Sequence, residues 1–149
     1  MRALIGTGLG FLLAVVWFDL MFDVQARGHR GPALPAAVLD SIATYYARVT
    51  TAARPMNRLI ALVMFSTLAA HIGELVRDEL PAWRGVSSLV LLTAAVGLAA
   101  LRTVGDAVRL GRGVDDTAVR SRLARSILRD HVVVVTLLAV ALVAQLAPT

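Results

Sequence analysis

The sequence contains no cysteine and no lysine. The lack of cysteine excludes a disulfide framework, a thiolate nucleophile and a cysteine-ligated metal site. All fifteen basic side chains are therefore arginine. Together with the abundance of alanine, valine, leucine and glycine, the absence of lysine indicates a bacterial protein from a GC-rich genome.

The common catalytic motifs are also missing. The chain has no phosphate-binding glycine loop, no H-E-x-x-H and no Ser–His–Asp arrangement that stands out. It has neither the H-x-x-x-H nor the E-x-x-H pair by which helical bundles hold metals. The sequence therefore favours a protein that is not an enzyme, and we expect no metal and no cofactor.

The chain does have long apolar runs. Of its 149 residues, 58% are hydrophobic, against about 45–50% in soluble domains. A membrane-spanning helix needs about 20 mostly apolar residues, and four segments qualify: 3–22, 56–76, 86–104 and 131–147. We therefore predict an all-α fold in which residues 1–149 form one integral membrane domain, a four-helix transmembrane bundle.

The arginines are distributed unevenly around these segments. Twelve lie in or beside the two long connections, whereas the opposite side has only Arg2, Arg77 and Arg84. Because arginine-rich loops stay in the cytoplasm, we expect a multi-pass protein of the bacterial inner membrane with both termini outside. The short connection "RDELPAWRG" then faces the periplasm. The pI of about 11.2 reflects cytoplasmic arginines that contact anionic lipid headgroups, and we expect no nucleic-acid partner.

Both long connections contain segments with helical periodicity. Segment 36–50 carries one apolar stripe and predicts an amphipathic helix on the inner membrane surface or packed under the bundle. Segment 117–130 predicts a basic helix, capped by Asp115 or Asp116, that continues into the fourth span. Gly6 and Gly10 have the spacing of a close helix contact, either within the bundle or in a homo-oligomer.

Polar side chains gather at the predicted cytoplasmic level of all four spans. Asp19 and Asp23 lie one helical turn apart on one face, and we expect Arg58 or Arg102 to balance Asp19. We expect Tyr45 and Tyr46, on the predicted helix 36–50, to cover this polar cluster from the cytoplasmic side. The cluster is either a set of structural salt bridges or a polar binding pocket, and its candidate residues are Asp19, Asp23, Asn57, Arg58, Arg102, Asp106, Asp130 and His131.

A second polar spot lies near the outer end of the second span. His71 and Glu74 are three residues apart and share a helix face. They either pair with each other or form the outer end of a proton or solute path. The polar residues that such a path would use within the membrane are Ser66, Thr67, Thr93 and Thr136.

These features leave three hypotheses for function. The first is binding or translocation of an ion or small polar solute through the inner cluster, with Asp19 and Asp23 as its carboxylates. The second is a non-catalytic accessory or scaffold protein that uses its basic cytoplasmic helices. The third is a membrane enzyme that acts on a lipid or quinone-like substrate, with His131 and a neighbouring aspartate as acid and base.

Overall fold

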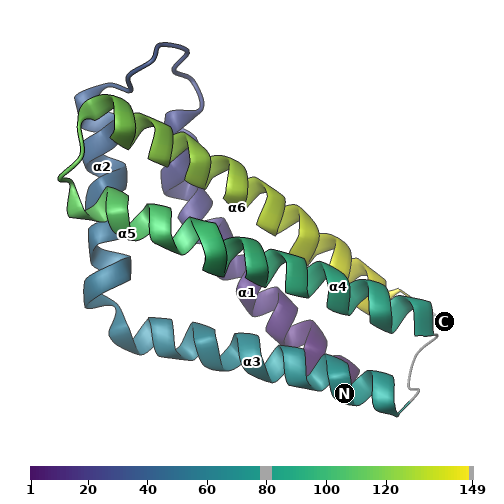
Figure 1. The fold of residues 1–149 in the computed structure, drawn as a ribbon. Coiled ribbons are helices and arrows are strands. Elements are labelled where there is room, and N and C mark those ends of the chain that lie inside the picture. The colour runs from purple at the N-terminus through teal and green to yellow at the C-terminus, as the bar shows by residue number, and fades with distance from the viewer. Residues whose placement is uncertain (78–81, 148–149) are drawn as a thin grey trace.

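The computed structural model describes residues 1–77 and 82–147. This part of the chain is helical and contains no strand. Four segments are long and apolar enough to cross a membrane: Arg2–Ala26, Arg54–Val76, Trp83–Arg112 and Thr117–Leu146. The predicted all-α fold with four long apolar helices is thus confirmed. Figure 1 shows both chain ends at one end of the bundle, here called the terminal end.

Three of the long helices are interrupted or flanked by other helical turns. Helix α1 (Arg2–Asp23) ends in a 3₁₀ turn, η1 (Val24–Ala26). Helix α4 (Ala82–Leu98) continues through a wide π-helical turn, η3 (Ala99–Thr103), into α5 (Val104–Arg112). A second π-helical turn, η2 (Arg48–Ala52), precedes α3 (Arg54–Val76). Residues 78–81 of the predicted periplasmic connection lie outside the described part of the chain.

Helices α4 and α5, joined by η3, form one continuous helical segment, here called the α4–α5 rod. It extends past residue 104, where the apolar run was expected to end. Its last turns form α5, which is amphipathic and buries Ala107 and Leu110 against the rest of the protein. The rod ends at Gly113, whose φ of +67° is a left-handed conformation that favours glycine.

The fourth rod is the longest helix. Helix α6 runs unbroken from Thr117 to Leu146, about 45 Å at 1.5 Å per residue. The Asp116 carboxylate accepts a hydrogen bond from the Val119 backbone N–H at 2.8 Å and caps its first turn. Packing mainly on α1 and α4, α6 holds the bundle together.

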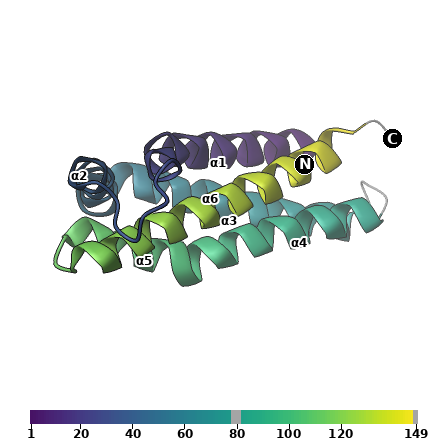
Figure 2. The same cartoon turned by 90° about the horizontal axis from the view of Figure 1, so that it is seen from above.

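Helix α2 (Ala36–Ala47) runs crosswise at the other end of the bundle, here called the α2 end (Figure 2). It buries Leu39, Ile42 and Tyr46 against α5 and α6. A separate apolar core, including Leu9 and Leu138, fills the space between the long helices. The protein therefore has two apolar cores, and the polar residues predicted at the cytoplasmic level lie where these cores meet.

Close contact between α1 and α3 depends on Gly8. A Cβ built there would overlap the Thr67 hydroxyl, so only glycine allows this approach. At Gly10 a Cβ would meet nothing within 4 Å, and at Gly6 it would make an ordinary contact of 3.6 Å with Leu146. Within the chain, the tightest contact of α1 is therefore made by the glycine between Gly6 and Gly10, and a role of that pair in a homo-oligomer stays a prediction.

Candidate functional site

Asp23 is the centre of the polar cluster at the α2 end. Its side chain is fully buried, and both carboxylate oxygens accept hydrogen bonds. The Tyr46 hydroxyl donates to Oδ1 at 2.7 Å, and His131 Nδ1 donates to Oδ2 at 2.6 Å. An ionised carboxylate can only accept, so its contact fixes the imidazole proton on Nδ1. A neutral His131 therefore carries its lone pair on Nε2.

Asp19 lies beside this pair, one turn earlier on α1. The Tyr45 hydroxyl donates to its Oδ1 at 2.5 Å, and the Phe22 ring stacks on Tyr45 with 3.9 Å between centroids. The other oxygen, Oδ2, is 3.9 Å from His131 Nε2. This distance is too long for a hydrogen bond, so these two atoms face each other without being joined.

Consecutive tyrosines on α2 serve both carboxylates. Neighbouring residues on a helix point about 100° apart, and this divergence lets Tyr45 reach Asp19 while Tyr46 reaches Asp23. Burial raises the pKa of both hydroxyls, and the adjacent carboxylates raise it further. The tyrosines therefore remain protonated donors. As expected from the sequence, they cover the polar level from the α2 side.

The position of α2 depends on close backbone contact with α5. A Cβ at Gly111 would lie 2.7 Å from the Ala47 nitrogen and 3.0 Å from the Tyr46 carbonyl carbon. Backbone atoms cannot rotate away as a side chain can, so a larger residue must push the two helices apart.

We expect Gly111→Ala to destabilise the protein by about 1–3 kcal/mol, as overpacking usually does, and to displace Tyr46. Gly105→Ala on the same helix is the control, because its Cβ would meet nothing within 4 Å. It should be neutral or stabilise by up to about 1 kcal/mol. Thermal unfolding in one detergent compares them, and equal stabilities would contradict the tight α2–α5 contact.

The predicted arginine partners of Asp19 were wrong. Arg102 instead contacts Asp130, with 3.2 Å between Nε and Oδ2, and donates to the Ser126 hydroxyl at 3.0 Å. Arg58 is exposed and forms no ion pair with a residue in the described ranges. Arg102 thus pairs with side chains of α6 and Arg58 lies on the surface, so neither balances Asp19.

Two other predicted cluster residues form no hydrogen bond or ion pair with Asp19 or Asp23. The Asn57 side-chain amide donates to the Val49 carbonyl at 2.9 Å and ties the start of α3 to η2. Asp106 faces a separate hollow between α5 and α6. The structure thus brings together Asp19, Asp23 and His131, with the two tyrosines as partners.

A cavity of about 640 Å³ reaches this group. It lies between α1, α2, α3, the α4–α5 rod and α6, where α3 and that rod separate toward the α2 end (Figure 1). Both π-helical turns contribute to its wall. Polar side chains occupy a small part of that wall: Asp19, Tyr45, Tyr46, Thr50, Asn57, Thr103 and His131.

The rest of the cavity wall is apolar and partly open to the surroundings. Methionine, valine, isoleucine and alanine side chains form most of it, including Met64, Ile60 and Val96. Three lining residues at its rim are at least half exposed, at 63% for Phe18, 50% for Met56 and 55% for Val104. A molecule can therefore enter from the side of the bundle.

The second polar spot has a different arrangement from either pattern expected. His71 Nδ1 donates to the Thr67 carbonyl at 3.0 Å, and its Nε2 is 2.9 Å from the Ser88 hydroxyl. Glu74 instead accepts from the Gln145 amide at 2.9 Å. Gln145 was missed as a partner, although α6 runs parallel to α3 and its place near the end of α6 matches the place of Glu74 near the end of α3.

No polar path joins the two spots through the described part of the bundle. Ser66, Thr93 and Thr136 are exposed on its outside, and only Thr67 is buried. Within residues 1–77 and 82–147, no three histidine, aspartate or glutamate side chains gather as metal ligands do.

The chain matches no protein-family model, no curated protein and no solved structure. Function is therefore inferred from the cavity and its polar wall.

Proposed function

We propose that the protein is a multi-pass membrane protein that binds a lipid-soluble molecule with a polar headgroup in the cavity at the α2 end. The observation that carries this proposal is an apolar cavity of about 640 Å³ with Asp19 and His131 in one wall. Pockets for small molecules commonly have about 300–1,000 Å³ and combine apolar walls with a few polar groups. The two π-helical turns add support, because such turns are rare and frequent at functional sites.

The distribution of arginines supports one orientation in the membrane. The connections at the α2 end carry most of the arginines, and the terminal end carries Arg2, Arg77 and Arg84. In a bacterial inner membrane this distribution favours an orientation with both termini outside and the cavity near the cytoplasmic face. The exposed rim residues then face lipid, and a lipid-soluble molecule reaches the cavity without crossing water.

The polar wall suits a headgroup that carries a hydroxyl. Asp19 Oδ2 and His131 Nε2 face each other 3.9 Å apart, and both can accept a proton from a hydroxyl. Asp23 holds the His131 ring through Nδ1. A quinol-like headgroup bound there donates to Nε2 or to Asp19, which is the first step of general-base chemistry. The proposal therefore extends to binding of the headgroup and acceptance of its hydroxyl proton.

Two other functions fit the structure less well. An ion or small polar solute would need several converging polar ligands, whereas most of this cavity wall is apolar. A non-catalytic accessory protein would have no need of the ligand-sized cavity that lies beside Asp19. The Arg102–Asp130 contact has the form of a structural salt bridge.

The test is ligand-dependent stabilisation of the purified protein in lipid nanodiscs. We expect decylubiquinol to raise the free energy of unfolding in a saturable manner, by about 2.7 kcal/mol at 100 times its Kd. Decylbenzene, which has a similar tail and no oxygen, should not stabilise the protein. Asp19→Asn should weaken the effect of decylubiquinol, because the amide cannot take up its proton.

Two outcomes would contradict the proposal. Equal stabilisation by decylubiquinol and decylbenzene would mean that the cavity does not recognise a headgroup. Stabilisation by simple salts such as sodium chloride, with no effect of decylubiquinol, would favour ion binding instead.

A further inference from the structure

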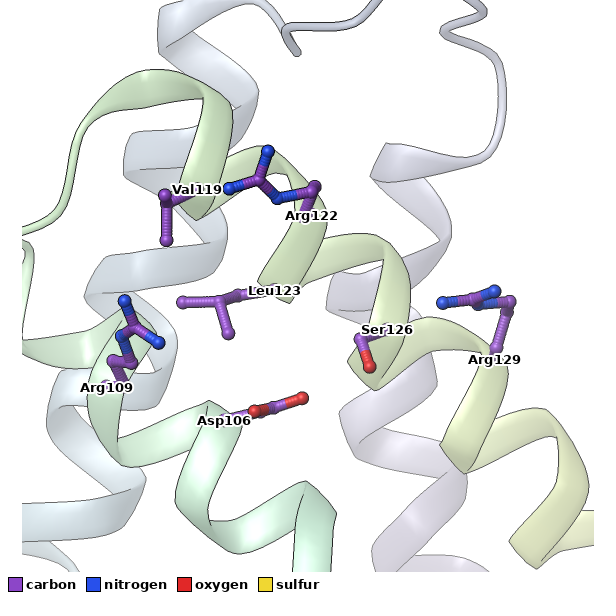
Figure 3. A pocket seen from close by; sticks show the side chains of 7 residues that line it. All are labelled: Asp106, Arg109, Val119, Arg122, Leu123, Ser126 and Arg129. Atoms are coloured by element: carbon purple, nitrogen blue, oxygen red, sulfur yellow. The ribbon is translucent and has the colours of Figure 1, made fainter.

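A second hollow of about 290 Å³ lies between α5 and α6, apart from the cavity described above. Figure 3 shows Asp106 and Arg109 from α5 facing α6, which contributes Arg122, Ser126 and Arg129. We call it the arginine hollow. None of its lining residues lines the larger cavity.

The charges around the arginine hollow are only partly paired. The Arg109 guanidinium donates to both oxygens of Asp115 at 2.8 Å, and this contact lowers the pKa of the Asp115 carboxyl. Arg122 and Arg129 are exposed and form no ion pair with a residue of the described segments. Asp106, half-buried in the same hollow, is likewise in no ion pair there. Two guanidiniums and one carboxylate are thus available to a ligand.

The depth of the hollow follows from the length of α6. About 20 residues cross the hydrocarbon layer, so the first third of this helix of 30 residues extends beyond it. Arg122 and Arg129 are two turns apart, about 10 Å along the axis. If the terminal end lies at the opposite membrane surface, Arg129 is at the edge of the hydrocarbon and Arg122 is among the headgroups.

We propose that the arginine hollow binds the headgroup of phosphatidylglycerol. Arg122 and Arg129 bind its phosphate, because the planar guanidinium matches phosphate oxygens with paired donors. Asp106 accepts a hydrogen bond from a glycerol hydroxyl. A free phosphate ion has no glycerol to reach from the two arginines to Asp106, so the mixed charge of the hollow favours the lipid. This proposal shares only the membrane orientation with the proposed function, and it involves none of the cavity residues.

The experiment measures lipid affinity by native mass spectrometry of the full chain titrated with phosphatidylglycerol. We expect Arg122→Gln/Arg129→Gln to lower this affinity by about tenfold or more. Arg48→Gln/Arg54→Gln is the matched control, because it removes the same charge from two exposed arginines outside the hollow. The control should keep its affinity within about twofold, since it removes no contact to the bound headgroup.

A third variant tests the role of the carboxylate. Asp106→Asn should reduce the preference for phosphatidylglycerol over phosphatidic acid, which has the phosphate and lacks the headgroup glycerol. Equal losses in both double-arginine variants would show diffuse attraction and overturn the proposal. It would also fail if inorganic phosphate displaced the lipid at equal concentration, because the hollow would then be a site for free anions. Ligand binding in the larger cavity is expected to be unchanged in all three variants.

Discussion

Asp23→Ala is expected to destabilise the protein by about 2–6 kcal/mol, because each buried donor left without a partner costs about 1–3 kcal/mol. The substitution removes the acceptor for both the Tyr46 hydroxyl and His131 Nδ1. Both donors then remain buried without partners, because Tyr46 and His131 are 3% and 7% exposed. It also frees the His131 ring, which removes its fixed orientation toward Asp19 and the cavity.

The measurement is reversible unfolding in mixed detergent micelles, with Asp40→Ala as the control. Asp40 pairs with Arg120 at the surface, where its side chain is 69% exposed, and its loss should cost about 0–1 kcal/mol. A similar small cost for Asp23→Ala would mean that the buried group does not hold α1, α2 and α6 together.

Ala61→Trp is expected to abolish the saturable stabilisation by decylubiquinol. Ala61 lines the cavity on α3, and an indole side chain there fills space that the ligand needs. The neighbouring Leu62 is 64% exposed on the outer face of the same helix. Leu62→Trp adds the same aromatic group outside the cavity and should leave the stabilisation unchanged.

The comparison separates occupancy of the cavity from partitioning into the surrounding lipid. Both variants place tryptophan on α3, so a general effect on the helix or on the nanodisc would appear in both. If Ala61→Trp binds decylubiquinol as the wild type does, the molecule binds elsewhere and the cavity is not its site.

The depth of the polar residues could be predicted from the sequence, but their direction around each helix could not. Hydropathy placed Asp19, Asp23 and His131 at one end of the bundle, and the structure brings them together. The same reasoning placed Arg58 and Arg102 at that depth. Which of them faces α1 depends on the rotation of α3 and α4, and apolar runs that are hydrophobic on all sides do not reveal rotation.

The cavity could not be predicted from the sequence. It depends on the separation of α3 from the α4–α5 rod and on two π-helical turns. Neither turn has a proline or a glycine that would mark it in the sequence. The Glu74–Gln145 contact was missed for a related reason, because α3 and α6 are distant in sequence and no periodic signal links them.

The most direct test of the central claim is a crystal structure grown from a lipid phase that contains decylubiquinol. We expect the quinol ring in the cavity, with one hydroxyl within hydrogen-bonding distance of His131 Nε2 or Asp19 and the tail leaving past Phe18, Met56 or Val104. A structure in which α3 packs against the α4–α5 rod and closes the cavity, with the quinol elsewhere, would contradict it.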